Sequence, residues 1–113
     1  MQYMLLIYDR DERDLAPPDL QALVAEHMRL AADMREAGVM IGGDGLQPVD
    51  TATTVRLQGG ERALHDGPFP DTREQLGGYY LIDVADLDAA VGWARRVPLH
   101  EGGGVEVRPV MTY

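Results

Sequence analysis

His27 is the residue whose type and position most directly suggest chemistry. It shares a stripe at helical spacing with apolar residues, namely Leu20, Leu23, Val24, Ala31 and Met34. A helix over this segment would therefore turn the imidazole towards the protein interior. Such an imidazole has a tunable pKa, as a general base requires. The alternative is a core histidine that only satisfies its own hydrogen bonds.

A second group of ionisable residues surrounds the segment Asp66-Gly67-Pro68-Phe69. Asp66, Asp71 and Glu74 are close in the sequence, with His65 beside them. Clustered carboxylates could place an acid and a base around a small substrate, or hold a divalent cation. The alternative is structural, because Asp66 can start a tight turn and Asp71 with Glu74 has the spacing of a capping box.

Two tyrosines and several arginines are candidates for substrate binding. Tyr79 and Tyr80 point to opposite faces of an expected strand, so one packs under the helices and the other faces the second side of the sheet. A hydroxyl there could reach a ligand, although packing alone also explains tyrosines in such strands. The cations available for a substrate carboxylate are Arg56, Arg62, Arg73 and Arg108. We expect Tyr79, Tyr80 and Arg73 to contact the substrate.

The motifs for metal, nucleotide and covalent chemistry are missing. The three histidines lack the i, i+4 spacing of a helical metal site, and Gly102-Gly103-Gly104 is followed neither by a Lys nor by a helix. Ser and Cys, the two commonest nucleophiles, do not occur. We expect no metal and no cofactor. Patterns in the sequence assign no role to His65 or His100.

Composition limits the class of protein. The 113 residues carry a net charge of −9, which repels phosphate backbones and excludes nucleic-acid binding. No run approaches the roughly 18 apolar residues of a membrane helix, and the beginning of the chain lacks the basic leader of a signal peptide. Without cysteines there are no disulfides. We therefore expect a cytoplasmic protein that binds neither nucleic acid nor membrane.

The expected elements form one α+β domain over residues 1–113. Helices are predicted from Pro17 to Gly38 and from Asp86 to Pro98. Strands are predicted at 2–8, 53–57, 62–65, 79–84 and 105–111, with 39–47 as a glycine-rich turning connection. This order matches a ferredoxin-like plait with an added β-hairpin. Phe69 is expected to pack in the core or at a subunit interface.

The first strand indicates an oligomer. Met4, Leu6 and Tyr8 alternate with Tyr3, Leu5 and Ile7, so both faces of this strand are apolar. Two helices can cover only one face of the sheet. A second copy of the chain is the simplest cover for the other face, which predicts a homodimer.

Three segments resemble a known family. Asp66-Gly67-Pro68-Phe69 with the strand that follows, the first strand Tyr3 to Tyr8 and the last strand Val105 to Val110 are similar to the DGPF group of the YCII-related proteins. The resemblance implies a dimeric α+β barrel. Some members have a helix histidine paired with an aspartate, which would correspond to His27 and Asp44.

Two functions of different classes follow. The first is a cofactor-free acid–base enzyme of lyase, isomerase or hydrolase type, acting on a small molecule in a pocket near the dimer interface. His27 would be its base, and Asp44 or Asp66 would orient His27 or act as acid. The second is a non-catalytic module that binds a small ligand or a protein partner. The resemblance links such a module to stress or sigma-factor pathways.

Overall fold

The structure is a computed structural model, and it describes residues 1–69 and 74–113. These ranges contain six strands, two α-helices and two short 3-10 helices. In chain order they are β1 (Gln2–Asp9), η1 (Glu12–Asp14), α1 (Pro17–Glu36), β2 (Met40–Gly45), η2 (Val49–Thr51), β3 (Thr53–Gln58), β4 (Glu61–Asp66), β5 (Gln75–Asp83), α2 (Leu87–Ala94) and β6 (Gly104–Pro109).

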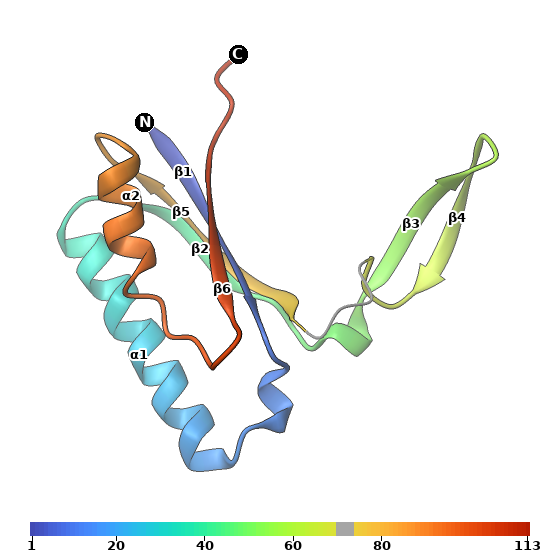
Figure 1. Cartoon of the computed structure of the whole chain (residues 1–113), viewed down its shortest axis with the longest axis horizontal. Coiled ribbons are helices and arrows are strands. Elements are labelled where there is room, and N and C mark those ends of the chain that lie inside the picture. The colour runs from blue at the N-terminus through green and yellow to red at the C-terminus, as the bar shows by residue number, and fades with distance from the viewer. Residues whose placement is uncertain (70–73) are drawn as a thin grey trace.

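Four strands form one antiparallel sheet in the order β2-β5-β1-β6, and both helices pack on one face of it (Figure 1). The core between the layers joins Tyr3, Leu5 and Ile7 of β1 to Leu30 and Met34 of α1, with Ala90 supplied by α2. This arrangement is the predicted ferredoxin-like α+β fold. Pro109 lies in β6 at the edge of the sheet, as the chemistry of proline favours.

Both helices begin where local chemistry predicts. Pro17 and Pro18 occupy the first positions of α1, and Asp19 lies in its first turn. Ala16, the residue before the helix, makes no side-chain capping hydrogen bond. Asp86 caps α2 by accepting a hydrogen bond from the backbone N–H of Ala89. Gly38 follows α1 with φ of +75°, which glycine adopts at little cost.

The prediction for residues 39–47 was wrong, because this segment contains the edge strand β2. Its glycines argue against a strand, but one of them, Gly43, is needed for close packing on β5. A Cβ on Gly43 would lie 2.8 Å from the backbone oxygen of Tyr79 and 2.9 Å from Cδ1 of Tyr80. Strand β5 also begins at Gln75, four residues before the predicted start.

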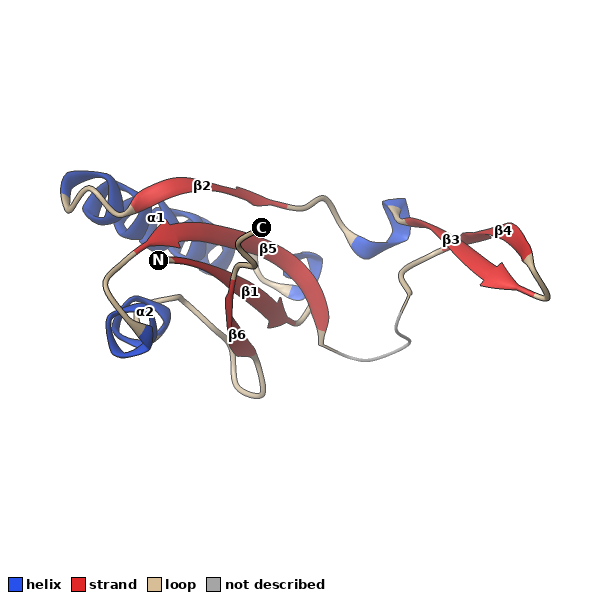
Figure 2. Cartoon of the chain, turned by 90° about the horizontal axis from the view of Figure 1, so that it is seen from above, coloured by secondary structure: helices blue, strands red, loops and turns tan. Residues whose placement is uncertain are grey.

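The β3–β4 hairpin is a separate two-stranded sheet that extends away from the body of the protein (Figures 1 and 2). It turns at Gly59-Gly60, as predicted. Phe69 follows the hairpin and is 67% exposed in the single chain, so the expectation of core packing was wrong. The guanidinium of Arg56 lies over its ring, 4.8 Å from the centroid.

Within the part of the chain that the structure describes, no helix covers the second face of the four-stranded sheet. Met4, Leu6 and Tyr8 point to this face and are only partly buried, whereas the alternating residues of β1 are buried under the helices. Arg108 and Glu106 lie beside them on β6 and form an ion pair at 3.7 Å. The homodimer that would cover this face stays a prediction.

Neither helix in the described ranges is long and apolar enough to cross a membrane.

Candidate functional site

A cavity of about 520 Å³ lies between α1 and the end of the sheet where β1 finishes. Its walls come from α1, from the residues after β1, from β2 and its following loop, from β5, and from the loop before β6. The volume is in the range of small-molecule sites, roughly 300–1,000 Å³. The cavity is therefore the natural place to look for function.

His27 lines this cavity and is bound to Tyr80. The distance from Nδ1 of His27 to the hydroxyl oxygen of Tyr80 is 2.8 Å, and the two rings stack with centroids 6.0 Å apart. In α1, His27 lies one turn before the buried Leu30. Strand β5 turns Tyr80 towards the same side of the sheet. Among the described residues, the other ring nitrogen of His27, Nε2, has no hydrogen-bond partner.

Burial sets the protonation of this pair. It lowers the pKa of His27 below that of a free histidine, although the carboxylates of Glu12, Glu26 and Asp9 oppose the shift. Burial also raises the pKa of Tyr80. At neutral pH the pair is therefore a neutral imidazole and a protonated phenol, and both groups can exchange a proton with a ligand.

Asp44 lines the same cavity as His27, but no hydrogen bond joins their side chains among the described residues. Asp44 pairs with Tyr79 across β2 and β5, and its carboxylate accepts a hydrogen bond of 3.3 Å from the Tyr79 hydroxyl. Tyr80 is buried in the core layer, and neighbouring residues of a strand point to opposite faces. The hydrogen-bond partner of His27 in this structure is Tyr80, and a role for Asp44 beside His27 stays a prediction.

Asp66 lies at the end of β4, opposite Thr53, and is exposed. It is absent from the described lining of the cavity. The turn after it has a structural role: Gly67 has φ of +110° and donates its N–H to the Ala52 carbonyl, and the Thr54 hydroxyl donates to the Gly67 carbonyl. Asp71 and Arg73, also predicted as site residues, lie outside the described residues.

A second polar pair, Asp9 and His100, was missed by the sequence analysis. Oδ2 of Asp9 lies 2.9 Å from Nδ1 of His100 and also accepts the backbone N–H of His100 at 3.0 Å. Both side chains are largely buried, with 14% and 22% exposed, and both residues line the cavity. The carboxylate fixes the ring's orientation, as in many catalytic histidine sites.

The glycines after His100 hold this pair in place. Gly103 donates its N–H to the His100 carbonyl, and a Cβ on Gly103 would lie 2.7 Å from Oδ1 of Asp9. Only glycine fits there without a shift of the carboxylate. The glycine run is thus closely packed at Gly103. A histidine two positions before a glycine run was the only signal in the sequence.

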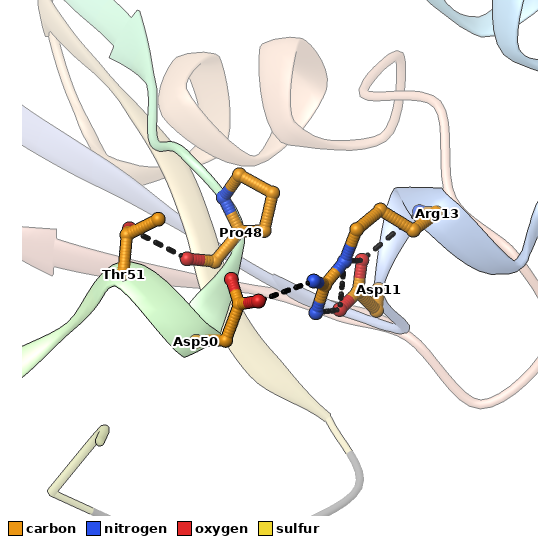
Figure 3. Close-up of polar contacts among 5 residues, drawn as sticks. All are labelled: Asp11, Arg13, Pro48, Asp50 and Thr51. Carbon is orange, nitrogen blue, oxygen red and sulfur yellow. Dashed lines mark hydrogen bonds and ion pairs between the residues drawn. The ribbon is translucent and has the colours of Figure 1, made fainter. Parts of the chain in front are cut away.

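Arg13 connects two walls of the cavity (Figure 3). Its guanidinium binds Asp11 in the connection after β1 and Asp50 in η2, at 2.5 and 2.7 Å. Arg13 lowers the pKa of Asp11 through these hydrogen bonds. The hydroxyl of Thr51 donates to the Pro48 carbonyl in the same loop. These contacts link the two loops beside the cavity.

The chemistry available in the cavity is proton transfer. It contains a neutral imidazole, a phenol and a carboxylate–imidazole pair within one volume. Over residues 1–69 and 74–113, no three His, Asp or Glu side chains are grouped as a protein metal site would require.

The sequence of this chain is similar to a known protein family and to another protein. A family model described as the YCII-related domain matches residues 1–113. An uncharacterised protein of Rhizobium meliloti (strain 1021) is 36% identical over 108 residues, which cover 94% of this chain and 82% of that protein.

Proposed function

Since the chain belongs to the YCII-related family, we propose that it is a cofactor-free acid–base enzyme of the lyase, isomerase or hydrolase type that acts on a small molecule. The observation that supports this most directly is the hydrogen bond of 2.8 Å between His27 and Tyr80 at the wall of a ligand-sized cavity. A histidine kept neutral by burial beside an open volume has the properties of a general base.

His27 would accept the proton at Nε2. If Nδ1–H donates to the Tyr80 oxygen, Nε2 keeps its lone pair, and the phenol hydrogen is available to a bound group. After proton transfer the imidazolium would remain hydrogen-bonded to the Tyr80 oxygen. Tyr80 would thus orient the base and donate to the substrate.

His100 would act as the acid of the site. With Nδ1–H bonded to Asp9, Nε2 is the ring nitrogen left for a ligand, and from the imidazolium form it would donate a proton. Asp9 would therefore orient His100, whereas the role expected of Asp44 or Asp66 was to orient His27 or act as acid. Two histidines with different partners then supply a base and an acid.

The test is solvent deuterium exchange. Small carbonyl compounds and carboxylic acids would be incubated with the protein in D2O, and NMR would record deuterium incorporation or product formation. We expect His27→Gln and His100→Gln each to reduce the rate by about 100-fold or more. His65→Gln is the matched control, because His65 lies on β4, away from the cavity. Equal rates in all three variants would reject the proposal.

A second candidate function is protein binding through the β3–β4 hairpin. Val55, Leu57 and Leu64 lie on one face of this hairpin by strand register and are 57%, 65% and 78% exposed. An isolated two-stranded hairpin is marginally stable in water, so an apolar face of this kind favours a partner. The simplest partner is a second copy of the chain, which would also cover the open face of the sheet.

A further inference from the structure

Arg10 carries an unsatisfied group at the wall of the cavity. It directly follows β1, and its Nε is the only buried side-chain nitrogen or oxygen without a hydrogen-bond partner in residues 1–69 and 74–113. A buried donor without an acceptor is destabilising, and more so when it belongs to a charged group. Such an atom calls for an acceptor that the described protein does not supply.

The carboxylates nearest in sequence to Arg10 are bound elsewhere. Asp9 accepts hydrogen bonds from His100 and from the backbone N–H of Arg10, and Asp11 is paired with Arg13. No ion pair within 4.0 Å joins the Arg10 guanidinium to a described carboxylate. Glu12 also lines the cavity and is the remaining competitor for Arg10.

The rest of the cavity suits an apolar body. Its lining includes Ile7, Leu23, Val24, Met40, Leu46 and Leu76. The lining also contains two cations, Arg10 and Arg35. A cation with an unsatisfied donor beside an apolar surface is complementary to a molecule with an anionic group and a hydrophobic remainder. The guanidinium can bind a carboxylate or a phosphate with two parallel hydrogen bonds.

We propose that Arg10 binds the anionic group of a small organic anion, with the apolar body of that ligand against α1. The ligand chemistry is a carboxylate or a phosphate ester. This inference rests on the proposed function in one respect, since it names the substrate class of the same cavity. The anion would then lie in the volume that His27 and His100 line.

Binding tests this directly. Benzoate, phenyl phosphate and the neutral isostere benzamide would be titrated at constant ionic strength by calorimetry and by NMR of the imidazole signals. We expect an anion to bind at least about tenfold more tightly than benzamide, and Arg10→Gln to remove that preference. Arg62→Gln on the hairpin should leave it unchanged. Glu12→Gln should strengthen anion binding by removing the competing carboxylate.

The possible outcomes distinguish failure of the anion-binding inference from failure of the proposed enzymatic function. Preference for benzoate or for phenyl phosphate identifies which anion the site takes. Equal binding of benzoate, phenyl phosphate and benzamide, or unchanged binding in Arg10→Gln, overturns the inference even if deuterium exchange depends on His27. Arg10-dependent binding without His27-dependent exchange leaves the anion site standing and rejects the enzyme. Arg10→Lys keeps the charge and should retain part of the preference if Arg10→Gln does not fold.

Discussion

The hydroxyl oxygen of Tyr80 lies 2.8 Å from Nδ1 of His27, and this bond joins β5 to α1 at the cavity wall. Because Tyr80 is buried and His27 is partly buried, water does not fully compensate either group when the bond is lost. Tyr80→Phe should lower the free energy of unfolding by about 1 kcal/mol, measured by urea denaturation. Tyr79→Phe is the matched control, since its bond to the exposed Asp44 is longer, at 3.3 Å. A larger loss in the control would contradict the assignment.

The lowered pKa of His27 makes stability depend on pH. The unfolded chain binds a proton on this ring below about pH 6.5, whereas the folded protein binds it only at lower pH. His27 therefore contributes stability above about pH 6.5, and that contribution is lost as the pH falls towards the folded-state pKa. The stability of wild type should decline over this window more steeply than that of His27→Gln. Parallel curves would show that burial does not control this ring.

Gly43 is predicted to be essential for the packing of β2 on β5. In Gly43→Ala the new methyl group would meet the backbone of Tyr79 and the ring of Tyr80, so stability should fall by about 1–3 kcal/mol. Gly42→Ala is the control, because a Cβ there has no atom within 4 Å. Thermal unfolding of both variants checks the prediction. Similar melting temperatures would mean that the strand pair relaxes without cost.

Gly103 is predicted to be required for the hydrogen-bond geometry of the Asp9–His100 pair. Its replacement by Ala would push on the Asp9 carboxylate, so Gly103→Ala should reduce deuterium exchange in the same direction as Asp9→Asn. Gly104→Ala should behave like wild type, since nothing lies within 4 Å of its Cβ position. The His100 ring signals in NMR report the geometry independently of activity. Unchanged ring signals in Gly103→Ala would show that Gly103 is not needed for the geometry of the Asp9–His100 pair.

The homodimer is testable by sedimentation velocity. Leu6 points to the uncovered sheet face, so Leu6→Glu should convert a dimer into a monomer if two sheets face each other. Leu87→Glu is the control, because Leu87 is also an exposed leucine but lies on α2, away from that face. A wild-type monomer at micromolar concentration would reject the predicted dimer.

Local rules were sufficient for much of the fold. Pro17 and Asp86 mark the starts of the helices, Gly59-Gly60 marks the hairpin, and the stripe containing His27 sets which face of α1 turns inward. Each of these depends on residues within a few positions of one another. The strand β2 was missed because its glycines are unfavourable in isolation. Gly43 becomes favourable only against Tyr79 and Tyr80, which follow more than thirty residues later.

The sequence by itself determined the class of fold, the inward position of His27 and the absence of Ser and Cys nucleophiles. Only the tertiary structure decided which groups meet in the cavity. Asp9 and His100 are 91 positions apart, and His27 and Tyr80 are 53 apart. No local spacing encodes such pairs, because they depend on the order of strands in the sheet and on which face each residue points to.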